Sequence, residues 1–182
     1  MRELSLHILD LARNSLEAGA TELTISLVER SREDLFLVTV ADNGRGMDED
    51  TLRRATDAFY TSRTTRRQGL GLPLFQAMCE RSAGAMEIES ALGVGTTIRA
   101  RVQLSHLDRP PLGDMGGVIQ ALACEADRVR LRYRHEVCGA VFELDSAELQ
   151  RQLGEVAVTA PAVLHWMGEH VREGLREVRS TA

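Results

Sequence analysis

Apolar residues near the start of the chain recur with the period of an α-helix. Leu4, Ile8 and Leu11 fall on one side of a predicted helix spanning residues 3–18. Gly19 follows this segment, and a glycine just past the last turn commonly ends a helix in the left-handed conformation. The pattern therefore predicts an amphipathic helix with one apolar side and one polar side.

Alternating apolar and polar residues come next. They predict strands at residues 22–28 and 35–40, joined by a polar turn at residues 31–34. Asp48 is placed to cap a helix that runs to about residue 58. We therefore expect a β-hairpin whose second strand leads into the loop before that helix.

The periodicity lapses at residues 59–68, a loop rich in arginine and hydroxyl groups. The segment 69–73, Gly-Leu-Gly-Leu-Pro, then opens an apolar helix that extends to Ala83. Residues 85–90 and 96–104 predict a second hairpin.

The remainder of the chain has a different character. Residues 106–113 contain Pro110 and Pro111 and are predicted to form a linker. Beyond it the pattern predicts a helix at 115–125, strands at 128–134 and 140–144, and a helix capped by Asp145 or Ser146. A last helix is predicted at 161–178. Its apolar stripe consists of Val163, Trp166, Met167 and Val171. We expect a domain at residues 1–105 and a small α+β appendage at residues 114–182. The stripe suits internal packing, and an effector or dimerisation module is the alternative.

Composition excludes several classes of protein. The chain has 182 residues, of which 43% are hydrophobic, enough to bury a core. A net charge of −5 argues against nucleic acid as a partner, because phosphate contacts need a basic face. All 22 basic residues are arginine, so guanidinium groups would have to bind any phosphate. No apolar run approaches about 18 residues, and we expect a soluble cytoplasmic protein with no membrane partner and with reduced cysteines.

The polar side of the first predicted helix carries candidate metal ligands. Its members are Glu3, His7, Asp10, Asn14 and Glu17. Asp10 and Asn14 are one helical turn apart, so their side chains lie one above the other. Carboxylate and carboxamide oxygens are ligands that Mg²⁺ accepts. An ordinary solvent-facing side is the alternative, and His7 is expected to be a plain member of it.

Asp42 directly follows an apolar strand and precedes Gly44 and Gly46. An ionised aspartate can only accept hydrogen bonds, so a buried one needs a donor such as the exocyclic amine of adenine. The two glycines leave the backbone bare enough for a flat ligand to lie against it. Asn-Gly is also a common tight-turn signal, and a plain turn is the alternative.

Gly69 and Gly71 stand where the apolar helix begins. Free N–H groups and the positive end of the helix dipole would suit a triphosphate there.

Zinc is not expected, since the spacing of His135, Cys138 and Cys124 matches no common zinc pattern.

Four segments in this order resemble the GHKL ATPase superfamily, which contains DNA gyrase B, the Hsp90 chaperones, histidine kinases and MutL. They are residues 10–20, 42–46, 69–72 and 93–97. The resemblance covers roughly residues 1–105 and implies an α/β fold, a two-layer sandwich in which ATP lies between helices and a mixed sheet.

The resemblance also implies a set of site residues, with ATP and Mg²⁺ as cofactors. By this resemblance Asp10 is catalytic, Asn14 binds the metal and Asp42 binds the adenine amine. Gly46 lies beside the base, with Gly44 and Met47 in the same loop, and Thr96 or Thr97 lies near the base. Gly69 and Gly71, with Leu70 between them, contact the phosphates.

The chain departs from the family pattern at two points. Hydrolytic members carry a glutamate where this chain has Asp10, which is one methylene shorter. The lysine that gyrase and MutL supply from a second domain has no counterpart, so Arg63, Arg66 or Arg67 would have to compensate. We expect a protein that hydrolyses ATP or transfers its γ-phosphoryl group to a protein partner, with a dimer possible. The alternative is a nucleotide-gated binding module with negligible turnover.

Overall fold

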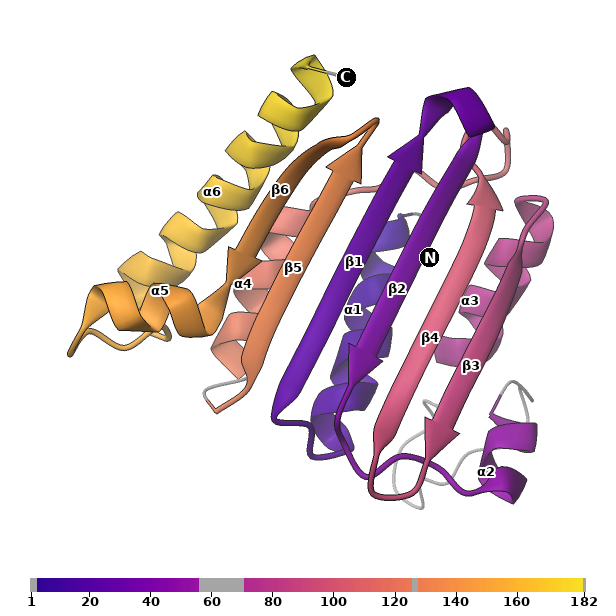
Figure 1. The fold of residues 1–182 in the computed structure, drawn as a ribbon, viewed down its shortest axis with the longest axis horizontal. Helices are drawn as coiled ribbons and strands as arrows, with labels where there is room; N and C mark the ends of the chain where they lie inside the picture. The colour runs from indigo at the N-terminus through magenta and orange to yellow at the C-terminus, as the bar shows by residue number, and fades with distance from the viewer. Residues whose placement is uncertain (1–2, 56–70, 126–127, 182) are drawn as a thin grey trace.

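Six strands form one mixed sheet in the computed structural model, which describes residues 3–55, 71–125 and 128–181 (Figure 1). Along the sheet the strand order is β3-β4-β2-β1-β5-β6. The strands are β1 (Glu22–Arg30), β2 (Leu35–Asp42), β3 (Ala85–Ala91), β4 (Gly95–Gln103), β5 (Arg130–Val137) and β6 (Ala140–Asp145). Among the strands of the described residues, the β1–β5 pair is parallel and the other neighbouring pairs are antiparallel.

Helices cover one face of this sheet, which gives the molecule two layers (Figure 1). The helices are α1 (Leu4–Glu17), α2 (Glu49–Arg54), α3 (Gly71–Arg81), α4 (Met115–Glu125), α5 (Ser146–Leu153) and α6 (Pro161–Ser180). Helix α1 packs between α3 and α4, and α6 packs on α4 and β6. The predicted sandwich of helices on a mixed sheet is confirmed.

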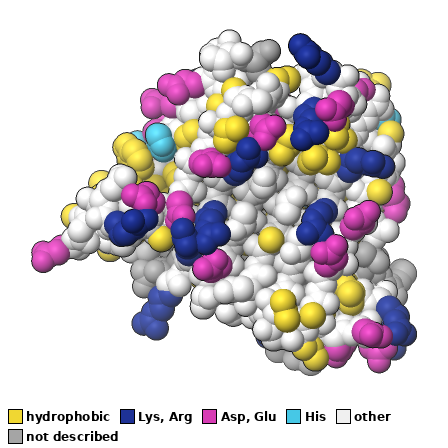
Figure 2. Space-filling model, in the orientation of Figure 1, with side chains coloured by type: hydrophobic (Ala, Val, Ile, Leu, Met, Phe, Trp, Pro, Cys, Tyr) yellow, Lys and Arg dark blue, Asp and Glu magenta, His cyan; other side chains and the backbone are white. Residues whose placement is uncertain are grey.

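The alternation in the strands decides which face the helices cover. Leu23, Ile25 and Leu27 of β1 are fully buried, whereas the residues between them are partly exposed. Successive side chains of a strand point to opposite faces, so the buried set forms the core against the helices. The other face carries interspersed basic and acidic side chains (Figure 2). Arg99 and Glu89 form an ion pair there.

Helix α1 ends where the sequence predicts. Gly19 has φ of +75°, its N–H donates to the Leu16 carbonyl, and the Ala20 N–H donates to the Ser15 carbonyl. These two bonds satisfy carbonyl groups that have no partner inside the helix, in the arrangement known as a Schellman motif.

Residues 106–113, predicted to form a linker, contain no helix or strand and are bonded to the start of α1. The N–H of Leu4 donates to the Pro111 carbonyl and the N–H of Ser5 donates to the Leu112 carbonyl. The first N–H groups of a helix lack partners within it, so the proline segment caps α1.

The segment beyond this cap extends the same sheet and was expected to form an appendage. Strand β5 pairs with the free edge of β1, and Leu131 and Tyr133 join the core that also contains Ile8. An unpaired edge of β1 would expose a row of backbone donors and acceptors, and β5 satisfies them. One sheet and one core therefore run across the expected domain boundary.

The buried side of α6 differs in part from the predicted stripe. Met167 and Val171 are fully buried as expected, but Trp166 remains 47% exposed. The helix instead buries Leu175 and Val178. The contacts of α6 with α4 and β6 determine which side of the helix is buried, and the periodicity of the sequence did not predict that side.

Candidate functional site

Asp42 is the last residue of β2 and lies where the sheet meets α1. Its Oδ2 accepts a hydrogen bond from Ser15 Oγ at 2.6 Å, and its Oδ1 accepts one from the Gly44 N–H at 2.9 Å. Ser15 is buried on α1, so this carboxylate is fixed to a helix as well as to a strand. A carboxylate has about four lone-pair positions, so Asp42 keeps acceptor capacity for a ligand.

The loop after Asp42 is held firmly to its surroundings. Asn43 Oδ1 accepts from the N–H groups of Thr21 and Glu22 at 2.9 and 2.8 Å. The Arg45 N–H donates to the Ala18 carbonyl at 2.9 Å. These bonds join the loop to both the end of α1 and the start of β1.

Gly46 is required by the backbone of this loop. Its φ is +67°, and an added Cβ would stand 1.9 Å from the Ala91 carbonyl oxygen. From the sequence, this glycine was expected to leave room for a flat ligand against the backbone; in the structure it packs against β3. The half-buried Met47 follows, and its N–H donates to Ser90 Oγ at 2.9 Å.

Asp10 and Asn14 lie beside the start of α3. A Cβ added to Gly71 would be 3.6 Å from Asp10 Cβ and 3.7 Å from Asn14 Nδ2. Burial raises the pKa of Asp10, and the positive charge of Arg13 opposes that shift. The helix start and the polar pair therefore border one small volume.

The register of β4 separates the two candidate threonines. Thr96 pairs with Asp42 and Thr97 pairs with Ala41. Because side chains alternate along a strand, Thr96 shares the helix-covered face with Asp42 and Thr97 lies on the opposite face. Of the two predicted alternatives, only Thr96 lies on the side of the site.

His7 is buried, which corrects its expected place on a solvent-facing side. It is 3% exposed, its ring centroid is 5.8 Å from that of Phe75, and its Nδ1 has no hydrogen-bond partner within the described residues. Burial lowers the pKa of His7 to about 4, with a smaller contribution from the charge of Arg81. Its position at the border of the apolar side, three residues from Leu4, was the available signal.

Several predicted site residues lie outside the described ranges. They are Arg63, Arg66, Arg67, Gly69 and Leu70, together with the rest of the predicted loop 59–68.

The zinc ligands considered from the sequence form no common site. His135 is buried and hydrogen-bonded to Glu29 Oε1 and Tyr133 Oη, whereas Cys138 and Cys124 are exposed. Across residues 3–55, 71–125 and 128–181, no group of three or more His, Cys, Asp or Glu side chains could hold a metal ion.

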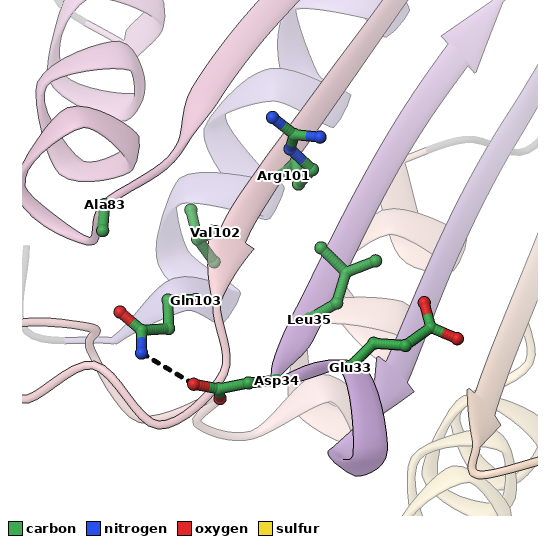
Figure 3. Close-up of a pocket in the computed structure, with 7 residues that line it drawn as sticks. All are labelled: Glu33, Asp34, Leu35, Ala83, Arg101, Val102 and Gln103. Atoms are coloured by element: carbon green, nitrogen blue, oxygen red, sulfur yellow. Dashed lines mark hydrogen bonds between the residues drawn. The ribbon is translucent and has the colours of Figure 1, made fainter.

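A cavity of about 480 Å³ lies at the other end of the sheet, between the turn before β2 and the end of β4 (Figure 3). Asp34 borders it and accepts hydrogen bonds from Gln103 and Ser105. Asp34 and Asp42 stand at opposite ends of β2, so this cavity is separate from the Asp42 site.

Comparison with known families matches residues 2–106 to the histidine kinase-, DNA gyrase B- and HSP90-like ATPase family. The chain belongs to this family. A histidine protein kinase, DivJ of Caulobacter vibrioides, is 30% identical over 105 residues, which are 56% of this chain and 18% of the kinase. The DNA mismatch repair protein MutL of Crocosphaera subtropica is 45% identical over 60 residues, 33% of this chain and 10% of that protein.

The fold has a solved counterpart, and the curated relatives are much longer than this chain. A crystal structure of the N-terminal domain of a DNA repair protein superposes with a TM-score of 0.57 at 16% identity, covering 80% of this chain and 53% of that one. The chain spans less than a fifth of the length of DivJ and of MutL. Among the helices of the described residues, none combines the length and apolar character needed to cross a bilayer.

Proposed function

We propose that the chain binds Mg·ATP at the end of the sheet, with the adenine amine on Asp42. The observation that carries this proposal is the carboxylate of Asp42, held by Ser15 and Gly44 with acceptor capacity left over. An exocyclic amine supplies the donor that such a group needs, and family membership supports a nucleotide as the ligand.

Asn14 fits the magnesium ion that accompanies the nucleotide. It offers a carboxamide oxygen next to Gly71, at the first turn of α3. Hard cations bind such oxygens, and N–H groups at a helix start donate hydrogen bonds to phosphate. When bound, the ion neutralises the charge that develops on the transferring phosphoryl group.

The reaction that fits this site is transfer of the γ-phosphoryl group to water, with Asp10 orienting the water and accepting its proton. Burial raises the pKa of Asp10, which makes its carboxylate a stronger base and so suits the role of general base. Transfer to a residue of a partner protein is the related reaction, and histidine kinases among the relatives support it.

A nucleotide-gated binding module is the second candidate. Asn43 binds Thr21 and Glu22, and the Thr21 carbonyl accepts from the Arg130 N–H at the start of β5. The loop after Asp42 is thereby connected to the sheet extension through consecutive hydrogen bonds. A change in the position of this loop on nucleotide binding would be transmitted to residues 128–181 even without turnover of ATP.

Calorimetry with Mg·ATP tests the binding site. Asp42→Asn keeps the volume but replaces an acceptor with a donor, and we expect affinity to fall about 30-fold or more, the equivalent of roughly 2 kcal/mol. Asp34→Asn, at the opposite end of the same strand, is the matched control and should bind as the wild type does. Unchanged affinity in Asp42→Asn would show that the loop is only a turn.

Incubation with γ-labelled ATP separates the possible outcomes. Hydrolysis releases labelled phosphate from the pure protein, and Asp10→Asn should bind ATP normally while releasing much less. Label on another protein in a cell extract identifies a kinase. ATP binding with neither signal would exclude turnover and leave the binding module.

A further inference from the structure

Two hydroxyl groups meet on the helix-covered face of β3 and β4, next to Asp42. Ser90 Oγ lies 2.9 Å from Thr96 Oγ1, 3.0 Å from the Gly95 carbonyl oxygen and 2.9 Å from the Met47 nitrogen. The register pairs Thr96 with Ser90 on one side and with Asp42 on the other. Thr96 thus lies between the serine and the carboxylate.

The partners of Ser90 determine where the hydroxyl protons lie. A serine hydroxyl has one proton to donate and two lone pairs. The Met47 N–H can only donate, so it occupies one lone pair, and the Gly95 carbonyl can only accept, so it takes the proton. The distance alone leaves the donor of the Ser90–Thr96 bond open. We assign the donor role to Thr96 because Ser90 donates its single proton to the Gly95 carbonyl.

This arrangement turns Thr96 into an acceptor for anything else that approaches it. With its single proton directed to Ser90, the Thr96 oxygen presents lone pairs on the face that it shares with Asp42. The site then offers two neighbouring acceptors. An amino group with two N–H bonds satisfies both, whereas a carbonyl oxygen would face acceptors on both sides and leave buried groups unpaired.

We propose that Ser90 is a positioning residue that sets base specificity by fixing Thr96 as an acceptor, so that a 6-amino purine is bound and a 6-oxo purine is rejected. This inference rests on the proposed function, because it assumes that the base lies at Asp42. Ser90 acts through Thr96 and through the Met47 backbone, and it does not need to touch the base.

The test compares the dissociation constants of ATP and inosine triphosphate, which carries a carbonyl in place of the amino group. In the wild type we expect ATP to bind at least tenfold more tightly, on the order of one well-placed hydrogen bond. Ser90→Ala frees the Thr96 proton to rotate toward the base, so the ratio of the two constants should fall by about tenfold. Ser90→Thr retains the hydroxyl and should restore the ratio.

Two further variants keep the test decisive. Thr96→Val removes the acceptor and should lower the ratio even if Ser90→Ala fails to fold. Thr97→Val, on the opposite face, is the matched control and should leave the ratio unchanged. A merely structural role of Ser90 would weaken both nucleotides equally, and an unchanged ratio in Ser90→Ala and Thr96→Val would overturn the inference. If that ratio is unchanged but Asp42→Asn abolishes ATP binding, the proposed function stands and the role of Ser90 is overturned. A wild type that binds neither nucleotide would overturn both the proposed function and the role of Ser90.

Discussion

An aspartate stands at each end of strand β2, and the two have different roles. Asp34 directly precedes the strand, and Asp42 is its last residue. At the first end, Asp34 accepts three hydrogen bonds from Gln103 and Ser105 and fastens the turn to the end of β4 (Figure 3). At the second end, Asp42 accepts two bonds and lies between the sheet and α1. The contrast shows that a carboxylate whose acceptor positions are mostly filled by its own chain is structural, whereas one with more of them left, between the helix layer and the sheet, is available to a ligand.

The backbone is also more exposed at the Asp34 end of β2 and more closely packed at the Asp42 end. The turn at Asp34 lies at the surface, beside an open cavity. The loop after Asp42 is pressed onto β3, with Gly46 in contact with Ala91. The loop is therefore rigid before any ligand arrives, which reduces the entropy lost on binding.

The largest expected effect comes from Gly46→Ala. An added Cβ would meet the Ala91 carbonyl oxygen at 1.9 Å, so the loop must separate from β3, and we expect the free energy of unfolding to fall by roughly 3 kcal/mol or more. Urea denaturation measures this. Gly19→Ala is the control, since it has a similar φ of +75° with no atom within 4 Å and should cost only about 1 kcal/mol. Equal costs would show that the contact with β3 is loose.

A second prediction concerns His7, in the N-terminal half of α1. Its pKa is lowered from 6.5 to about 4 in the folded protein, so the unfolded chain binds a proton over that range and the folded protein does not. Stability is therefore fully retained above pH 6.5 and falls as the pH drops toward 4, by roughly 2 to 3 kcal/mol. His7→Phe should remove this dependence in urea titrations at stepped pH. Persistence of the slope in His7→Phe would assign it to other groups.

A third prediction concerns Glu29, which lies at the Asp34 end of the sheet and bonds to His135 and Arg179. Although burial opposes it, the hydrogen bonds from these partners lower the pKa of Glu29 from 4.5 to about 2. Its contribution to stability is present above pH 4.5 and is lost as the pH falls toward 2, roughly 2 kcal/mol in all. Glu29→Gln should flatten the stability curve below pH 4.5. Glu33→Gln, an exposed neighbour, is the control and should leave the curve unchanged.

The smallest expected effect is that of Asp34→Asn. An amide oxygen can still accept from Ser105, so we expect a loss of about 1 kcal/mol in unfolding free energy and no loss of ATP affinity. A drop in ATP affinity would mean that the two ends of β2 are coupled, and the comparison between them would fail.

Local pattern was sufficient to predict most elements and their order. The Schellman end of α1, the Asp48 cap of α2, and the start of α6 at Pro161 each depend on a few neighbouring residues, and each lies where it was predicted. The helical spacing of Asp10 and Asn14 likewise placed two side chains together before any tertiary contact was known.

Contacts between distant residues could not be predicted in this way. Nothing in the sequence pairs Ser15 with Asp42, because the bond requires α1 to lie across the end of β2. The same holds for the bond between Ser90 and Met47, which requires β3 to lie beside the loop. His7 was misplaced because the packing of Phe75, a residue on α3, decides its burial.

The sequence by itself determined the elements, the order of the family motifs and the residue types at the site, since hydrophobic period and capping chemistry act over a few residues. Tertiary structure alone decided that β5 completes the edge of β1, that Pro111 caps α1, and that Thr96 rather than Thr97 faces the site. These outcomes depend on satisfying backbone groups and burying apolar faces across the whole sheet, which no local window of sequence contains.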